Sequence, residues 1–360
     1  MNYKIYHIHK CLFIYYKYSN FGGKSLDILK VKELVENNYN LHIEYIQKIK
    51  NVYKISNDYN NFCLKVINYD FGHFLFIISA IKYLKKNDFK NTPEILNTQC
   101  GQEYIQLEDK FAYLTPWVDS RVADYDNSLD VLLAASKLAE LHNKSLGFKL
   151  TEDMNPRIGW FKWIETFNTR ENEILDFKGR ILKKDKKTKF DVMYLDKMDE
   201  EIEFCKSSKK NLSESNYLEK MKIEIVKNGF CHHDYANHNV LITGDGNVNV
   251  IDFDYCILDT HLHDLSSLLL RIMKHGKWNM NIALFILDAY DSINRVMKDD
   301  ISIMAGFMEF PQDYWQLGIQ YYWEKHRWTE DVFIKKLKKI YDDEEEKQNF
   351  IDDFRIRKYS

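Results

Sequence analysis

The chain contains few of the residues that interrupt regular structure, since its 360 residues include only 4 prolines and 13 glycines. Together with a hydrophobic content of 45%, this scarcity excludes a disordered or low-complexity polypeptide and favours an ordered, helix-rich globule. The chain also has no excess of positive charge, because its formal net charge is −3. Composition therefore gives no basis for a nucleic-acid surface or a polybasic membrane anchor, and we expect neither partner.

Long apolar runs and closely spaced cysteines are also missing. The longest apolar runs, such as residues 74–78, are far too short to span a bilayer. Residues 1–25 have no sustained apolar core and no small-residue cleavage site, so we expect synthesis in the cytoplasm and an extra, poorly ordered N-terminal segment. The six cysteines form no Cys-x-x-Cys pair, which favours buried thiols in a reducing compartment.

Hydrophobic periodicity divides the chain into a β-rich part, residues 26–115, and a helical part, residues 116–360. The elements expected in the first part are a helix from residue 27, two strands (43–55 and 62–66) joined by a turn at 57–61, a helix at 72–86, and strands at 103–107 and 111–115. The second part is predicted to be helical, with a lysine-rich solvated loop at 183–187. One hairpin interrupts it. The predicted class is α+β, with a small β-rich lobe and a large helical lobe.

The hairpin is indicated by Asp245-Gly246 between two apolar runs, a pair typical of a tight primed turn in which both central residues have positive φ. Asn239 lies six residues before Asp245, and Asp252 lies six residues after Gly246. Because the strands run antiparallel, these two side chains are expected at the same end of the hairpin. An ordinary surface hairpin with polar ends would leave this pairing as a coincidence.

The residues at that end are those that phosphoryl transfer requires. A carboxylate and an amide oxygen from neighbouring strand ends can hold Mg²⁺, which assigns Asn239 and Asp252 as metal ligands and Asp254 as an auxiliary ligand. A separate carboxylate must orient or deprotonate the attacking hydroxyl, and Asp234, five residues before Asn239, is predicted to be this base. In the first part, Lys65 lies late in an apolar strand, where a kinase places the lysine that contacts phosphate. The alternative for Lys65 is a side chain that snorkels at a strand edge.

Five histidines crowd into residues 232–263, and two of them precede an aspartate, at 233–234 and 263–264. This pattern allows a second interpretation, a His/Asp metallohydrolase. We rank it lower because such sites usually place their ligands on packed helices, whereas the first pair lies on a loop. We expect His232 to brace this loop and Asp264 to cap and anchor the following helix.

With these residues identified, the chain resembles the aminoglycoside phosphotransferase/choline kinase branch of kinase-like folds. His232, Asp234 and Asn239 match that branch's loop, a His-x-Asp followed by Asn five residues after the Asp, and residues 251–254 resemble its metal-binding segment. A closer resemblance is to the CotS-type spore coat protein family within this fold group. The stretches that carry it, between about residues 26 and 354, are 51–65, 73–84, 114–117, 125–142 and 308–324.

The resemblance implies an ATP and Mg²⁺ site and a small-molecule hydroxyl as phosphate acceptor. It also implies Asn51, Lys65, Thr115 and Trp117 as nucleotide contacts. As a spore coat protein, the chain would be made in the mother cell, be deposited in the spore coat and have other coat proteins as partners.

Two departures from an active kinase leave two classes of function open. The expected nucleotide loop, residues 47–51, has no glycine, so its backbone amides cannot approach phosphates as a glycine-rich loop allows. The predicted helix at 72–86 has no acidic residue to pair with Lys65, although active kinases usually supply a glutamate there. The sequence is therefore compatible with a phosphotransferase or with a catalytically inactive structural component of the coat.

Overall fold

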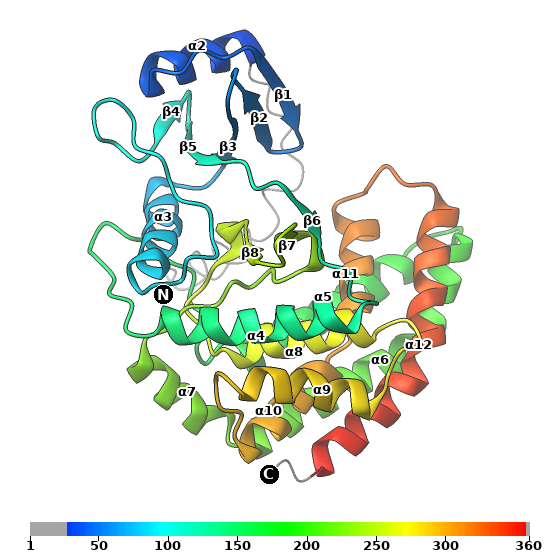
Figure 1. Cartoon of the computed structure of the whole chain (residues 1–360). Coiled ribbons are helices and arrows are strands. Elements are labelled where there is room, and N and C mark those ends of the chain that lie inside the picture. Colours follow the sequence, from blue (N-terminus) through cyan, green and yellow to red (C-terminus); the bar gives the residue numbers. More distant parts are fainter. Residues whose placement is uncertain (1–26, 358–360) are drawn as a thin grey trace, which may run out of the picture. The chain divides into compact units, whose positions relative to one another are not determined.

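The computed structural model describes residues 27–357, so the predicted N-terminal segment, residues 1–25, lies outside the described residues. The described chain contains both helices and antiparallel sheets, and it divides into two compact units that are described separately (Figure 1). The first unit comprises the described residues up to Phe74 together with Pro93–Val118, and the second comprises Leu75–Thr92 and the residues from Asp119 onward.

The first unit is built on a five-stranded antiparallel sheet with the strand order β1-β2-β3-β5-β4. Its elements are α2 (Ile28–Tyr39), β1 (Tyr45–Ile49), β2 (Val52–Ser56), β3 (Asn61–Ile67), β4 (Ile105–Leu107), β5 (Lys110–Pro116) and the start of α3 (Phe71–Lys86). Helix α2 begins at Asp27, whose side chain accepts a hydrogen bond from Leu29 N. Val31 and Val35 of this helix are fully buried in one apolar cluster with Tyr53 and Leu64 of the sheet. Burial of these side chains holds the helix on the sheet.

The alternating run at residues 43–55 forms two strands instead of the predicted one. The chain reverses at Lys50 and Asn51, where Ile49 pairs with Val52 across a two-residue turn. Lys50 has a φ of 54°, in the left-handed region that such a turn requires. The sequence analysis missed this reversal because the turn contains no glycine, and the polar-apolar alternation continues on both sides of it.

The second unit contains a group of helices and a three-stranded antiparallel sheet with the order β6-β7-β8. Its elements are the rest of α3, β6 (Ser120–Val122), α4 (Ser128–Ser145), α5 (Trp163–Leu182), α6 (Lys189–Glu214), α7 (Tyr217–Lys227), β7 (Val240–Thr243), β8 (Val248–Val250), α8 (Leu262–Met273), α9 (Met280–Asp291), α10 (Lys298–Glu309), α11 (Gln312–Gly318), the π-helical turn Ile319–Trp323 and α12 (Glu330–Ile356). The helix predicted at 72–86 is present as α3. The lysine-rich stretch separates α5 from α6, but Lys184 in it binds the buried Asp191 at 2.7 Å, so it is only partly solvated.

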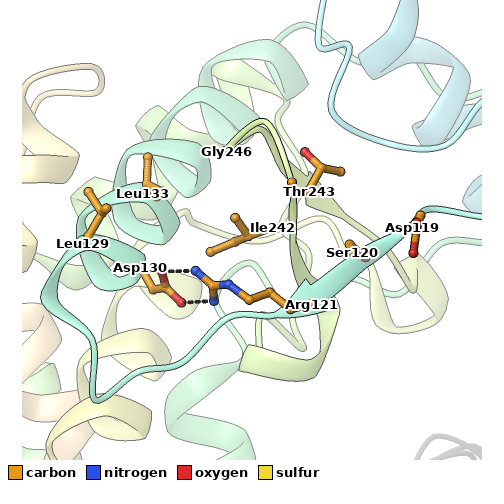
Figure 2. Close-up of a pocket in the computed structure, with 10 residues that line it drawn as sticks. Asp119, Ser120, Arg121, Leu129, Asp130, Leu133, Ile242, Thr243 and Gly246 are labelled. Atoms are coloured by element: carbon orange, nitrogen blue, oxygen red, sulfur yellow. Dashed lines mark hydrogen bonds and ion pairs between the residues drawn. The ribbon is translucent and has the colours of Figure 1, made fainter.

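Strand β6 was not predicted, and an ion pair fastens it to α4. Arg121 on β6 donates two hydrogen bonds to Asp130 in the first turn of α4, at 2.5 and 2.8 Å (Figure 2). Asp130 is fully buried and also accepts the Asp124 amide at 2.8 Å. The hydrogen bond from Arg121 lowers the pKa of this carboxyl. A hollow of about 500 Å³ lies beside the pair, with Leu133 and Ile242 on its apolar wall.

Two glycines give a matched test of this packing. A Cβ at Gly318, at the end of α11, would lie 2.3 Å from the Tyr194 hydroxyl and 2.7 Å from the Phe177 ring, whereas one at Gly179 in α5 would meet nothing within 4 Å. Gly318→Ala should lower the free energy of unfolding by about 1–3 kcal/mol. Gly179→Ala should raise it by about 0.5–1 kcal/mol, because alanine restricts the unfolded chain. Urea unfolding measures both, and equal effects of the two substitutions would contradict the packing described.

Candidate functional site

The loop that enters β7 is fixed through its backbone by a carboxylate on α8. Cys231 pairs with Ile257 in an isolated β-bridge at the start of this loop. Asp264, in the first turn of α8, then accepts the amide of His232 at 2.7 Å and that of His233 at 2.9 Å. His233 has a φ of 66°, so the backbone turns sharply at this point. The two hydrogen bonds set the direction in which the next residue, Asp234, leaves the loop.

Asp264 is fully buried, and two histidines also bind it. His142 Nε2 lies 3.2 Å from its Oδ2, and His263 Nδ1 lies 3.3 Å from its Oδ1. Burial alone would raise the pKa of Asp264, but the hydrogen bonds from His142 and His263 hold it well below its ordinary value. Asp264 was expected to cap its own helix, and that expectation is wrong. The carboxylate accepts amides of the loop instead, and the hydroxyl of Thr260 accepts the first helical amide, Leu262 N, at 3.3 Å.

The carboxylate of Asp234 is held from both sides. Arg271 Nη2 donates to Oδ1 at 2.8 Å, and Asn239 Nδ2 donates to Oδ2 at 3.2 Å and to the Asp234 carbonyl at 2.9 Å. Sequence reasoning missed Arg271. The available signal was its place seven residues after Asp264, because two turns of helix bring both side chains to one face of α8.

The β7–β8 hairpin brings Asn239 and Asp252 to one end. Val240 pairs with Val250, and Ile251 N donates to Asn239 O at 3.0 Å, so Asp252 is the next residue along. Asp252 has φ 67° and ψ 65°, a left-handed backbone that turns the chain out of the strand. Asp254 follows in a single 3-10 turn and is 8% exposed. The pairing thus places Asn239 and Asp252 at the same end of the hairpin, with Asp254 two residues beyond Asp252.

The other end of the hairpin differs from the predicted two-residue primed turn. Thr243 N donates to Asn247 O at 3.0 Å, so the loop contains three residues. Of Gly244, Asp245 and Gly246, only Gly246 has a positive φ, 82°. This is the arrangement of a three-residue hairpin loop that ends in a left-handed glycine. Asp245 can therefore keep an ordinary backbone and use its side chain to accept the Asn247 amide at 3.3 Å.

His232 lies where a brace for the loop was expected. Its Nε2 is 2.9 Å from the carbonyl of Ile251, and its Nδ1 accepts the amide of Asp234 at 3.3 Å. Since a carbonyl can only accept, the ring proton belongs on Nε2. The imidazole therefore connects the residue before Asp252 to the amide of the proposed base.

The metallohydrolase interpretation requires a cluster of metal-ligating side chains in the part of the chain that the structure describes. There, one trio of His, Cys and acidic residues brings its ligand atoms within 4.8 Å of one another, namely His142, Cys231 and Asp264. All three are engaged within the protein, because His142 Nδ1 lies 2.7 Å from the Tyr290 hydroxyl and Cys231 Sγ donates to Thr260 O at 3.2 Å. Burial raises the pKa of the Cys231 thiol well above its ordinary value, which disfavours the thiolate that a metal would need.

The four predicted nucleotide contacts all belong to the first unit. Lys65 lies on β3, is 5% exposed and pairs with Val52 and Tyr113 on the neighbouring strands. Thr115 is buried on β5, and Asn51 occupies the exposed turn after β1. Trp117 follows β5, and its ring is covered by the Lys54 ammonium at 4.8 Å from the ring centroid. These positions are compatible with nucleotide contacts, which stay a prediction.

Removing Asp264 tests whether it holds the loop. Asp264→Ala would leave the buried amides of His232 and His233 without an acceptor, so the free energy of unfolding should fall by about 3–5 kcal/mol. Asp185→Ala, at an exposed position, should change it by less than about 0.5 kcal/mol. Because the pKa of Asp264 is lowered, its contribution is present above the unfolded value of about 3.9 and is lost below it. Urea unfolding at neutral and acidic pH measures both effects, and a wild-type-like Asp264→Ala would contradict them.

Comparison with solved structures identifies the fold. An aminoglycoside phosphotransferase from Alicyclobacillus acidocaldarius superposes with a TM-score of 0.80 at 20% identity, over 93% of this chain and 98% of that one. Spectinomycin phosphotransferase APH(9)-Ia, solved with ADP and spectinomycin, gives 0.66 at 16% identity, over 89% and 98%. Amicoumacin kinase hAmiN, solved with AMP-PNP and Ca²⁺, gives 0.62 at 14% identity, over 88% and 93%. The predicted α+β, protein-kinase-like fold is confirmed.

Family comparison agrees with the predicted spore coat group. No curated protein sequence matches the chain. The family model described as "Spore coat putative kinase YutH" matches residues 32–354. The resemblance to a spore coat family within the aminoglycoside phosphotransferase/choline kinase-like fold group is therefore confirmed, under the YutH name. The chain belongs to the YutH spore coat family.

Proposed function

We propose that the chain is a phosphotransferase of the spore coat that uses ATP and Mg²⁺ to phosphorylate a hydroxyl group of a small molecule. The observation that supports this most is the fixed carboxylate of Asp234, held by Arg271 and Asn239 on a loop that Asp264 anchors. A surface loop without a catalytic role has no need to orient one partly exposed carboxylate from two sides.

Asp234 acts on the acceptor. Its carboxylate accepts a hydrogen bond from the attacking hydroxyl and takes the proton as the new P–O bond forms and ADP leaves. Arg271 fixes one oxygen of Asp234, and Asn239 fixes the other. Pre-orientation of this kind lowers the entropy that the reaction step must lose.

Asn239, Asp252 and Asp254 are the residues that would hold Mg²⁺. Two carboxylates and an amide oxygen form the hard, oxygen-only ligand set that this ion prefers. Because the amide nitrogen of Asn239 donates to Asp234, its oxygen is directed away from that residue and is available as a ligand. When bound, the ion supplies positive charge that neutralises the phosphates of the nucleotide. Lys65 contacts the phosphates, and Asn51, Thr115 and Trp117 complete the nucleotide contacts.

The spore coat is the proposed location, reached after synthesis in the mother cell, with other coat proteins as partners. The family name supports the coat, and three solved relatives are kinases or phosphotransferases of small molecules by name. None of the described helices is both long and apolar enough to cross a membrane.

A purely structural coat component is the second candidate function. Its support comes from the β1–β2 turn, in which Lys50 and Asn51 replace the longer glycine-rich loop that would place backbone amides against phosphates. The absence of an acidic residue in α3 points the same way. Nucleotide binding separates the two candidates.

The first experiment is thermal melting with and without MgATP. A nucleotide present at 100 times its dissociation constant should stabilise the wild type by about 2.7 kcal/mol. Asp252→Asn should lose most of this stabilisation, because an amide is a weaker metal ligand than a carboxylate. Asp245→Asn, which changes a carboxylate at the opposite end of the same hairpin, should keep it. Absence of a shift in the wild type at millimolar MgATP would reject the phosphotransferase and favour the structural role.

The second experiment separates binding from chemistry. Asp234→Asn should retain the MgATP-induced shift in melting temperature but release ADP at least about 100-fold more slowly in the presence of hydroxylated acceptors, since the proton acceptor is lost. Arg271→Gln should also retain the shift and slow turnover by a smaller factor. Unchanged ADP release in Asp234→Asn would show that this residue is not the base.

A further inference from the structure

Two glutamates on different helices of the second unit bury carboxylate oxygens without any hydrogen-bond donor. Glu201 lies on α6 and is only 2% exposed, and Glu344 lies on α12, which packs against α6. Within residues 27–357, no donor reaches Oε1 of Glu201 or either carboxylate oxygen of Glu344. A buried carboxylate is normally paired or coordinated, because loss of water around an uncompensated charge is unfavourable.

The neighbouring charges do not compensate this pair. Lys197 faces it from α6, but its ammonium lies 2.6 Å from the carboxylate of Glu200. Lys347 faces it from α12 and donates to the Phe310 carbonyl at 3.5 Å. Since Lys197 is paired with Glu200, Lys347 is the remaining ammonium near the two buried glutamates. Burial raises the pKa of Glu201 well above its ordinary value, with the charge of Glu344 adding to the effect, and burial raises that of Glu344 to about 6.

Glu344 opens onto a hollow that is lined mainly by polar side chains. This hollow, of about 340 Å³, is lined from α6 by Lys197, Glu200 and Phe204 and from α12 by Tyr341, Glu344, Glu345, Gln348 and Asn349. Gln348 follows Glu344 by four residues and so lies on the same face of α12. Its amide nitrogen donates to Asp352 at 3.1 Å, which directs its oxygen elsewhere. An ion can therefore approach from solvent and meet amide side chains beside the carboxylate of Glu344, with the buried Glu201 on the neighbouring helix α6.

We propose that Glu201 and Glu344 bind a divalent cation of the calcium class between α6 and α12, with amide oxygens of α12 and water completing its coordination. Calcium takes six to eight oxygen ligands in flexible geometry, which two carboxylates, amide oxygens and water can supply. Zinc is a poorer fit because it favours nitrogen and sulfur ligands. The bound ion joins α12 to α6 and is independent of the proposed phosphotransfer site.

Thermal melting of the full chain in calcium, without nucleotide, tests the site. After removal of metals with EDTA, CaCl₂ up to about 10 mM should raise the melting temperature in a saturable manner, since even weak protein calcium sites have dissociation constants of about 10⁻³ M. Glu201→Gln and Glu344→Gln should both abolish the rise. Glu201→Gln should also melt higher than the wild type in EDTA, because it removes an acidic group whose ionised form is disfavoured by burial and by the nearby Glu344.

Two variants show where calcium acts. Glu203→Gln, which alters an exposed glutamate of α6 paired with Lys206, should respond to calcium like the wild type. Asp252→Asn should also respond, and loss of the response there would place the ion at the phosphotransfer site and overturn the proposal. Absence of a calcium effect in the wild type, or its persistence in both glutamine variants, would overturn it too. A melting temperature that rises only on acidification would show that a shared proton holds the pair.

Discussion

The buried carboxylate of Asp264 is the contact on which the candidate site depends. It places a full negative charge in the interior, where the amides of His232 and His233 and the rings of His142 and His263 supply its hydrogen bonds. Charged hydrogen bonds of this kind are stronger than neutral ones, and the surrounding protein excludes the water that would weaken them. The loop geometry therefore follows from helix α8, whose side chains fix it.

Helix α8 acts on the loop at two points. Its first turn contributes Asp264, which binds backbone, and its last turn contributes Arg271, which binds the side chain of Asp234. Figure 1 shows α8 beside α4, and His142 of α4 reaches the same carboxylate. A helix held by its neighbours is a more rigid support than a loop, so the orientation of Asp234 depends on the packing of the whole helical unit.

Much of this arrangement could be predicted from sequence, because it depends on patterns between residues that are close together in the chain. Hydrophobic period indicated the helices and strands, and antiparallel pairing alone brought Asn239 and Asp252 together. The misses have equally physical causes. Strand β6 is three residues long and too short to show alternation, and the reversal at Lys50 lacks a glycine. Arg271 looks like an ordinary helix-surface charge, since its partner, Asp234, is distant in sequence and only the fold brings the two close.

Asp264 and Arg271, both on α8, are subject to different selection over evolutionary time, because the first supports folding and the second supports the proposed chemistry. A lineage that ceased to transfer phosphate would still need Asp264, since the folded state rests on it, and the loop backbone would keep its shape. Asp234 and Arg271 hold no backbone amide in place, so selection on folding alone would leave them free to drift. Among members of one family, retention of Asp234 and Arg271 would therefore indicate that phosphate transfer is still under selection. Retention of the surrounding loop would indicate only that the fold is maintained.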